Sequence, residues 1–255
     1  MSNAPTLLAG DLAFVTGAGQ GNGQAIAIGL ARHGATVIAT DMDAASAEDT
    51  AVAIRASGGE AHAYPLDVTD SAACRALTAE TEKAHGPVSI LINNAGILVR
   101  GLITDDNADE AWRRTMDVNL DGVYAVTKAC LNQLKKTKGR IVNIASVQVY
   151  VHAPRNSMAY SVSKAGVGLL TKALALELAE DGVRVNALAP GMIATAMSAV
   201  TRADPARLAN YLKHVPMNRP GEPEELVGPV VFLASEMSSY VTGAILPVDG
   251  GYLTM

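Results

Sequence analysis

Residues 12–23, LAFVTGAGQGNG, contain the pattern that decides the fold. The apolar run over residues 12–16 predicts a short buried strand, and the glycines after it let the backbone turn tightly without Cβ collisions. A helical pattern follows over residues 22–33 and ends at Gly34. A helix that begins directly after such a loop presents free N–H groups and the positive end of its dipole to an anion. The stretch therefore predicts a loop that binds a pyrophosphate, with a glycine-rich turn that binds nothing as the alternative.

Strand-like and helix-like segments alternate along the rest of the chain. Further strands are predicted at residues 35–40, 61–66, 88–93, 140–145, 183–189 and 244–248, and helices at 43–57, 71–85, 107–136 and 160–180, the last strongly amphipathic. Such alternation requires right-handed crossovers and a parallel sheet with helices on both faces. No linker or internal repeat interrupts it. We therefore predict an α/β fold, with one doubly wound Rossmann-type domain over residues 1–255 built on a parallel seven-stranded sheet.

An acidic residue follows the second predicted strand. Asp41 lies 18 residues beyond Gly23, where a carboxylate can accept hydrogen bonds from the adenosine ribose hydroxyls of a dinucleotide and repel a 2′-phosphate. Residues 18–22 and 40–45 contain no Lys or Arg that would bind that phosphate. The sequence thus predicts NAD rather than NADP as the cofactor. A helix N-cap is the other interpretation of Asp41, although Asp43 is available for that role.

A second group of residues suits proton transfer. Tyr160 and Lys164 are four residues apart and share one face of a helix, where an ammonium group near the phenol favours the phenolate. Ser146 ends the fifth predicted strand, and its hydroxyl can hydrogen-bond a substrate oxygen without titrating. Alone, a Tyr and a Lys at this spacing more often form a partly exposed helix pair. The combination with a dinucleotide loop favours catalysis.

These residues together give the chain a resemblance to the classical short-chain dehydrogenase/reductase family. The resemblance covers about residues 8–252 and rests on several motifs in the family's order. They are Thr16-Gly17-x-x-x-Gly21-x-Gly23, Asp67-Val68, Asn93-Asn94-Ala95-Gly96, Asn119, Ser146, Tyr160-x-x-x-Lys164, Pro190-Gly191 with Thr195, and Asp249-Gly250-Gly251.

The resemblance implies a role for each matching residue. Tyr160 would be the general acid/base, Ser146 would hold the reacting oxygen, and Lys164 would bind the nicotinamide ribose and lower the pKa of Tyr160. Asn119 would anchor a water in a proton relay. The implied cofactor contacts, besides Tyr160 and Lys164, are Gly17, Gln20, Gly21 and Asn22 in the loop, Asp41, Asp67, Val68, Asn93 and Gly96 on the adenosine side, and Pro190, Ile193 and Thr195 beside the nicotinamide.

Two of these residues have simpler interpretations, and one position departs from the family. Asn119 could satisfy backbone groups at a helix kink, and Thr195 could be a helix N-cap. The family usually has an aliphatic residue, most often Ile, where this chain has Asn22. The sequence leaves open whether the Asn22 amide contacts the phosphates or the nicotinamide.

The substrate pocket in the family is formed by segments that here carry several neutral polar side chains. The candidate substrate residues are Gln148, His152, Asn156 and Met192. They favour a polyol, a sugar or a small hydroxy compound, although each could be a solvated loop residue. A 3-oxoacyl-carrier-protein-type reductase is the alternative enzyme, with Arg100, Arg155 and Arg202 available as a basic docking patch. A catalytically silent dinucleotide sensor is the alternative of another class.

Composition excludes several other functions. The chain has 255 residues, 49% hydrophobic and only 4% aromatic, with a net charge of −5. These values predict no nucleic-acid partner, and no apolar stretch is long enough for a membrane span. The five histidines are scattered, so we expect no metal site. Cys74 and Cys130 are interpreted as small buried residues in a reducing, cytoplasmic protein. The resemblance implies a homotetramer.

Overall fold

The computed structural model describes residues 6–151 and 156–254, and its strands form one all-parallel sheet in the order β3-β2-β1-β4-β5-β6-β7. The strands are β1 (Leu12–Thr16), β2 (Thr36–Asp41), β3 (Glu60–Pro65), β4 (Ile90–Asn93), β5 (Arg140–Ile144), β6 (Arg184–Pro190) and β7 (Ile245–Val248). The helices are α1 (Gly21–Arg32), α2 (Ala44–Ala56), α3 (Ser71–His85), α4 (Ala108–Met116), α5 (Gly122–Thr137), α6 (Met158–Glu177), α7 (Ala199–Arg202), α8 (Pro205–Leu212) and α9 (Val227–Ala234). This arrangement confirms the predicted α/β fold and its seven strands.

The direction of strand addition reverses beside β1. The chain builds β2 and β3 on one side of β1, and β4 then returns to pair with β1 on the other side. Loops that leave β1 and β4 therefore diverge to opposite faces and open a crevice at the carboxyl edge of the sheet. Both the glycine loop and the Asn93-Asn94 segment lie at this reversal point.

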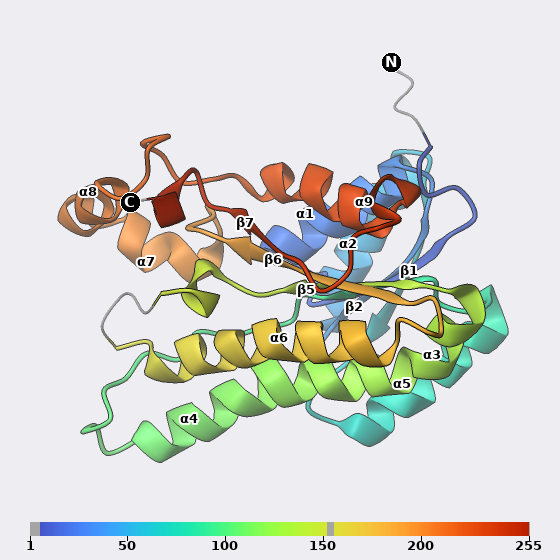
Figure 1. Ribbon diagram of the computed structural model, residues 1–255, viewed down its shortest axis with the longest axis horizontal. Helices are drawn as coiled ribbons and strands as arrows, with labels where there is room; N and C mark the ends of the chain where they lie inside the picture. The colour runs from blue at the N-terminus through green and yellow to red at the C-terminus, as the bar shows by residue number, and fades with distance from the viewer. Residues whose placement is uncertain (1–5, 152–155, 255) are drawn as a thin grey trace.

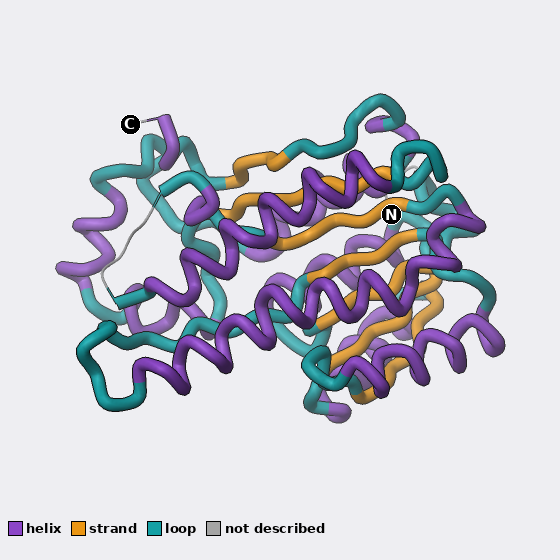
Figure 2. Tube along the Cα trace, turned by 60° about the horizontal axis from the view of Figure 1, so that its bottom comes forward, coloured by secondary structure: helices purple, strands orange, loops and turns teal. Residues whose placement is uncertain are grey.

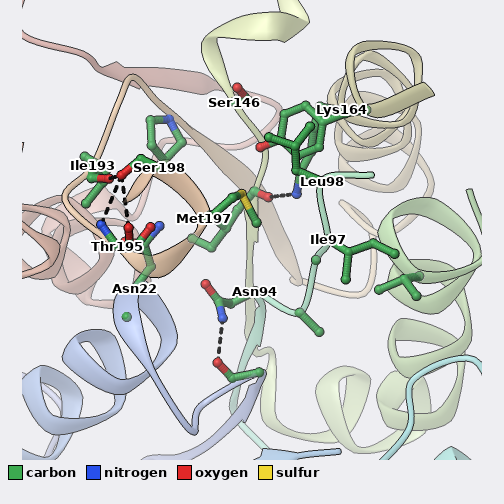
Figure 3. Close-up of a pocket in the computed structure, with 18 of the residues that line it drawn as sticks. Asn22, Asn94, Ile97, Leu98, Ser146, Lys164, Ile193, Thr195, Met197 and Ser198 are labelled. Carbon is green, nitrogen blue, oxygen red and sulfur yellow. Dashed lines mark hydrogen bonds between the residues drawn. The ribbon is translucent and has the colours of Figure 1, made fainter. Parts of the chain in front are cut away.

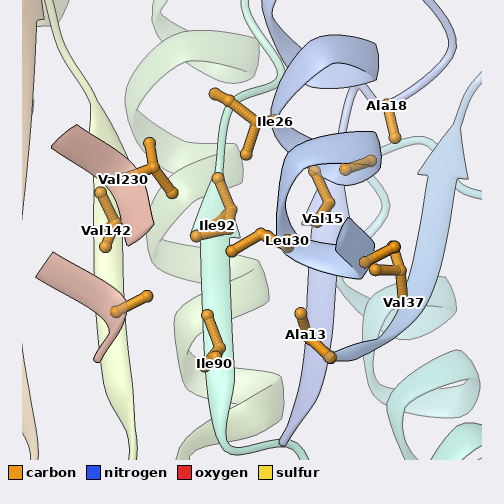
Figure 4. Close-up of a cluster of buried hydrophobic side chains, with 14 of the residues drawn as sticks. Ala13, Val15, Ala18, Ile26, Leu30, Val37, Ile90, Ile92, Val142 and Val230 are labelled. Atoms are coloured by element: carbon orange, nitrogen blue, oxygen red, sulfur yellow. The ribbon is translucent and has the colours of Figure 1, made fainter. Parts of the chain in front are cut away.

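Helices cover both faces of the sheet, as Figure 1 shows: α1, α2 and α9 lie on one face, and α3, α5 and α6 lie on the other. Side chains alternate along β1 because successive residues of a strand point to opposite faces. Ala13 and Val15 pack with α1 and α9 in the cluster drawn in Figure 4, whereas Leu12 and Phe14 pack on the α3 and α5 side. Burial on both faces explains why the strands read as continuous apolar runs.

The predicted helix over residues 107–136 is interrupted. A single wider π-turn, Asp117–Asp121, separates α4 from α5, although the axis continues almost straight in Figures 1 and 2. Such turns insert one residue into a helix and often occur at functional sites. Asn119 lies in the middle of this turn, which the prediction of one continuous helix did not include.

The prediction that residues 160–180 form a strongly amphipathic helix is wrong in its pattern. The helix α6 spans Met158–Glu177, and apolar side chains lie on its outward face as well as against the sheet. Leu169 is 70% exposed and Leu176 is 82% exposed. The solvent-facing side of α6 is therefore partly apolar.

Two further expectations can be compared with the described residues. Cys74 and Cys130 are both buried and unbridged, as predicted, and burial raises the pKa of the Cys74 thiol to about 11. No helix within residues 6–151 and 156–254 is long and apolar enough to cross a membrane.

Candidate active site

The glycine loop after β1 makes a cradle that has no room for side chains. Gly17 adopts a φ of 62°, in the left-handed region that favours glycine. A Cβ on Gly23 would lie 1.9 Å from the carbonyl oxygen of Gly17. Asn94, which follows β4, holds the loop from behind, since its Nδ2 donates to the carbonyl oxygens of Thr16 at 3.0 Å and Gly17 at 2.9 Å. The N-terminus of α1 opens on this bare backbone, so the loop fits the phosphates of a dinucleotide.

Asp41 closes one end of the loop. Its Oδ2 accepts a hydrogen bond from Gly19 N at 2.9 Å, and its Oδ1 accepts one from Asp43 N at 3.1 Å. Asp43, not Asp41, caps α2, because the Asp43 side chain accepts from Ala45 N. Main-chain N–H donors therefore fix Asp41 at the rim of the cavity, and Asp41 does not cap α2.

The proton-transfer residues meet where β5 ends and α6 begins. Ser146, Tyr160 and Lys164 are all buried, and all three line the same cavity. The Lys164 ammonium donates to the carbonyl oxygen of Ile144 at 2.7 Å and lies 5.8 Å from the centre of the Tyr160 ring. Figure 3 shows Ser146 and Lys164 together at one end of the cavity. Four-residue spacing on α6 and the strand end at Ser146 thus bring these groups together, as the sequence predicts.

Burial dominates the electrostatics of this group in the free protein. Burial raises the pKa of the Tyr160 phenol, and a hydrogen bond with Ser146 lowers it by a smaller amount. Burial also lowers the pKa of Lys164 to about 8. In the free protein the net shift of the Tyr160 pKa is therefore upward, because removal of the phenolate from water is the largest contribution.

Asn119 lies beside the cavity and forms hydrogen bonds with residues near its wall. Its Oδ1 accepts from Ile97 N at 2.8 Å, and its Nδ2 donates to Ile97 O at 2.9 Å and to Ser163 Oγ at 3.1 Å. The side chain is fully buried and is absent from the cavity wall. A Cβ on Gly96 would contact both Asn119 Oδ1 at 3.3 Å and Lys164 Nζ at 3.4 Å. Asn119 thus ties the π-turn to the chain beside Gly96, which is the simpler interpretation considered for it.

The prediction that Asn93 contacts the cofactor is not supported by the position of its side chain. Asn93 is buried between β4 and its neighbours, where Nδ2 donates to Asn143 Oδ1 at 2.8 Å and to Thr127 Oγ1 at 3.0 Å. It does not line the cavity, whereas the next residue, Asn94, does. Side chains alternate at the end of a strand, so only one of two adjacent asparagines can face the crevice.

The other predicted cofactor residues surround one cavity of about 1340 Å³. The predicted residues on its wall, beyond those already described, are Gln20, Gly21, Asn22, Asp67, Val68, Pro190, Ile193 and Thr195. Asp67 is locked in a turn, because its Oδ1 accepts from both the N–H and the hydroxyl of Thr69. Thr195 caps a short 3₁₀ turn, Ala196–Ser198, as its simpler interpretation suggested.

The substrate candidates lie at the Tyr160 end of the same cavity. Gln148, Asn156 and Met192 line it, whereas His152 lies outside the described residues. Gln148 Oε1 accepts hydrogen bonds from the hydroxyls of Ser161 and Ser157. Its carbonyl is therefore occupied, and its N–H groups are the part that can donate to a ligand.

Sequence reasoning missed an aromatic cluster at this end. Tyr211 on α8 stacks on Tyr252, with ring centres 5.1 Å apart, and His214 meets the edge of Tyr252. The Tyr211 oxygen accepts a hydrogen bond from Met192 N at 2.9 Å, and burial raises the Tyr211 pKa to about 12. All three rings line the cavity of their own chain. The position of Tyr252 just after β7, at the carboxyl edge that carries the other motifs, was the available signal.

Among residues 6–151 and 156–254, no group of three or more His, Cys, Asp or Glu side chains is arranged to hold a metal ion. The cavity instead combines a bare glycine loop, an acidic rim and a buried Tyr-Lys pair. Its shape and its donor groups fit a nicotinamide dinucleotide with a small substrate beside the nicotinamide end.

Comparison with known proteins agrees with this geometry. Residues 17–253 match the family model described as enoyl-(acyl carrier protein) reductase. The chain is 45% identical to galactitol 2-dehydrogenase (L-tagatose-forming) of Cereibacter sphaeroides over 96% of each chain, and 40% identical to 3-oxoacyl-[acyl-carrier-protein] reductase of Synechocystis over 96% of this chain and 98% of the other. The gluconate 5-dehydrogenase of Burkholderia cenocepacia, solved with NADP and tartrate, has a TM-score of 0.94 and 35% identity, covering 100% of both chains. The chain therefore belongs to the short-chain dehydrogenase/reductase family, whose members are oxidoreductases that use a nicotinamide dinucleotide.

Proposed function

We propose that this oxidoreductase interconverts a secondary alcohol of a polyol, sugar or small hydroxy compound and the corresponding ketone, with Tyr160 as the general acid/base. The observation that carries the proposal is the burial of Ser146, Tyr160 and Lys164 around one end of a cavity whose other end has the dinucleotide loop. The relative that acts on galactitol supports the polyol class.

Each residue at this end of the cavity has a separate role in the proposed reaction. When bound, the dinucleotide supplies the hydride acceptor for oxidation and the hydride donor for the reverse reaction. Tyr160 Oη takes the proton of the substrate hydroxyl during oxidation and returns it during reduction. Ser146 Oγ donates a hydrogen bond to the reacting oxygen. Lys164, held by Ile144 O, provides positive charge on the phenol side of the cavity when it is protonated. Gln148 N–H donates to a second oxygen of the substrate.

A turnover assay with a matched tyrosine control tests this assignment. The purified protein is mixed with galactitol, gluconate and related hydroxy compounds, and NADH or NADPH formation is followed by absorbance. Tyr160→Phe should lower kcat by about 10²–10⁴-fold and leave NADH affinity within a few-fold. Tyr240→Phe is the control, since Tyr240 is fully exposed and outside the cavity. Unchanged turnover by Tyr160→Phe would refute the role of the phenol.

The preferred cofactor in this proposal is NAD. Its support is Asp41, whose carboxylate is fixed at the rim of the cavity by Gly19 N and Asp43 N. A 2′-phosphate at that position would meet like charge. The gluconate 5-dehydrogenase noted above was solved with NADP, so the two cofactors must be compared directly. We expect wild-type kcat/KM to favour NAD, and Asp41→Ser to narrow the difference; equal use or a preference for NADP by the wild type would overturn the proposal.

A 3-oxoacyl-carrier-protein-type reductase is the second candidate, because one relative with 40% identity has that activity. However, two of the basic residues suggested for docking form hydrogen bonds within the chain. Arg202 donates to Ser198 Oγ at 2.9 Å and to Thr195 O at 3.0 Å, and Arg100 contacts Asn156. Arg155 lies outside the described residues. Reduction of a 3-oxoacyl thioester with NADPH, faster than oxidation of any polyol, would favour this candidate. Dinucleotide binding without turnover of either substrate class would favour a sensor.

The remaining expectations belong to the same proposal. We expect residues 1–255 to act as one domain for binding and catalysis, since residues from Gly17 to Tyr252 line the same cavity. We expect a cytoplasmic protein. We also expect a homotetramer, and the exposed apolar residues Leu169 and Leu176 on α6 support this assembly. Burial of such a face against another copy would remove apolar surface from water. Light scattering of the wild type and of a Leu169→Glu, Leu176→Glu variant tests the assembly: a wild-type monomer would refute it.

A further inference from the structure

Asn22 has a buried oxygen atom with no hydrogen-bond partner. The residue is the second of α1 and lines the cavity, and its Oδ1 is shielded from solvent without a donor among the described residues. In Figure 3 the Asn22 side chain points from the start of α1 towards the loop that carries Thr195 and Ser198. A buried amide oxygen without a donor costs free energy, so such groups in folded proteins need a reason.

The nearby loop does not provide a donor. The Ser198 hydroxyl donates to Ile193 O at 2.6 Å, and its oxygen accepts from Arg202 Nε at 2.9 Å. Thr195 N donates to Ser198 Oγ and Ile193 O. These groups are thus bonded among themselves. A molecule that enters the cavity can supply the donor that Asn22 Oδ1 lacks among the described residues.

The position of Asn22 indicates which part of a bound dinucleotide would supply the donor. The adenosine end is expected beside Asp41 and Asp67, whereas Asn22 lies between the glycine loop and the loop of Ile193 and Thr195. The pyrophosphate offers only acceptors at neutral pH, so it cannot satisfy an amide oxygen. The carboxamide N–H groups and the ribose hydroxyls of the nicotinamide riboside half are donors.

We propose that Asn22 is a cofactor-positioning residue whose Oδ1 accepts a hydrogen bond from the nicotinamide riboside half of the dinucleotide. This inference rests on the proposed function. It assigns to this chain a polar contact that the aliphatic residue usual at this position cannot make. Asn22 then helps to fix the reactive half of the cofactor opposite Tyr160.

A pair of ligands that differ only in the nicotinamide riboside half tests the contact. NADH and ADP share the adenosine and pyrophosphate groups, and ADP lacks the whole nicotinamide riboside half. Their affinities are measured by calorimetry for the wild type and for Asn22→Leu. Leucine has nearly the same shape without polar atoms. The variant should bind NADH about tenfold more weakly and ADP within about twofold of the wild type. If the wild type prefers NADPH, NADPH and 2′-phospho-ADP replace the two probes.

Thermal unfolding of the free protein gives an independent readout. Removing an unpaired buried oxygen should leave the Tm of Asn22→Leu equal to or above that of the wild type, whereas loss of a structural hydrogen bond would lower it. Asn132→Leu is the control for the same substitution, because Asn132 is exposed on α5 and away from the cavity. It should change neither affinity.

The outcomes separate this inference from the proposed function. Equal weakening of NADH and ADP, or weakening of neither, would overturn the contact with the nicotinamide riboside half. A fall in the Tm of free Asn22→Leu would assign Asn22 to the fold instead. A wild-type protein that binds no nicotinamide dinucleotide would overturn the proposed function, and the inference with it.

Discussion

Lys164 allows the electrostatics of the site to be measured without substrate or cofactor. Burial lowers its pKa from 10.5 to about 8. The unfolded chain therefore binds more protons than the folded protein between these two values, and the free energy of unfolding rises with pH across that window. With about 1.4 kcal/mol for each pKa unit, the lysine destabilises the fold by about 3 kcal/mol at pH 7 and about 1 kcal/mol at pH 9.5. The expected change is about 2 kcal/mol.

The variant Lys164→Met isolates this effect. Methionine cannot be charged, but it also removes the hydrogen bond from Lys164 Nζ to Ile144 O, which costs about 1–3 kcal/mol if the carbonyl is left unpaired. The two effects oppose each other at pH 7, so the sign of the stability change at one pH decides nothing. The lost hydrogen bond does not depend on pH, whereas the cost of the buried charge does. The stability of the wild type should therefore increase relative to Lys164→Met by about 2 kcal/mol between pH 7 and pH 9.5.

Urea unfolding at both pH values, at one fixed protein concentration, measures the difference. Other groups, such as the Cys74 thiol, titrate in both proteins and cancel in the comparison. Lys172→Met is the control, because Lys172 is exposed on the same helix. Its difference from the wild type should be the same at both pH values. A pH-independent difference between the wild type and Lys164→Met would show that the amine is not desolvated in the free protein and would refute the reasoning.

Three further predictions concern the loop, the aromatic cluster and the sheet edge. Gly23→Ala should destabilise the protein by about 1–3 kcal/mol and weaken NADH binding, because a Cβ would lie 1.9 Å from Gly17 O; urea unfolding and calorimetry measure both effects. Tyr211→Phe should raise the KM for the alcohol about two- to tenfold with an unchanged Kd for the dinucleotide, because Met192 N–H loses its acceptor. His85, at the end of α3, stacks on His62 of the edge strand β3. Burial lowers the pKa of His85, so the unfolded chain takes up a proton at a higher pH than the folded protein does. The Tm of the wild type should therefore fall more than that of His85→Phe between pH 7 and pH 5.

The sheet could be predicted from the sequence because its physical signal is local. Strands buried on both faces must be apolar along their whole length, and β1 and β2 show this as LAFVT and TVIATD. Predicted and observed strand ends differ by at most two residues, since pairing rather than composition determines where a ladder stops. The residues after the strands followed from the topology, because parallel strands bring their carboxyl ends to one edge.

The parts that could not be predicted depend on contacts between distant residues. Asn93 and Asn94 are adjacent and chemically identical, and only the orientation of the strand end determines that Asn94 faces the crevice while Asn93 bonds to Asn143. Tyr211 and Tyr252 are far apart in the sequence, and their rings stack only because the fold brings α8 beside the segment that follows β7. The direction of the Tyr160 pKa shift depends on burial, which spacing along a helix does not reveal.

Asn119 and the polar residues that enter the cavity differ in how their buried groups are paired. Asn119 uses both ends of its amide on Ile97 and Ser163, and its arrangement is complete within the fold. Tyr160 and Lys164 instead bring a phenol and an amine into the cavity, where burial opposes their charged forms. Asn22 brings an amide oxygen that lacks a donor. Each of these groups lowers the stability of the folded protein. Selection for stability alone would replace such groups with apolar ones, so their presence together in one cavity is best explained by function. A ligand that satisfies all three should therefore raise the Tm of the wild type more than that of Asn22→Leu at equal ligand concentration, and equal shifts would contradict this explanation.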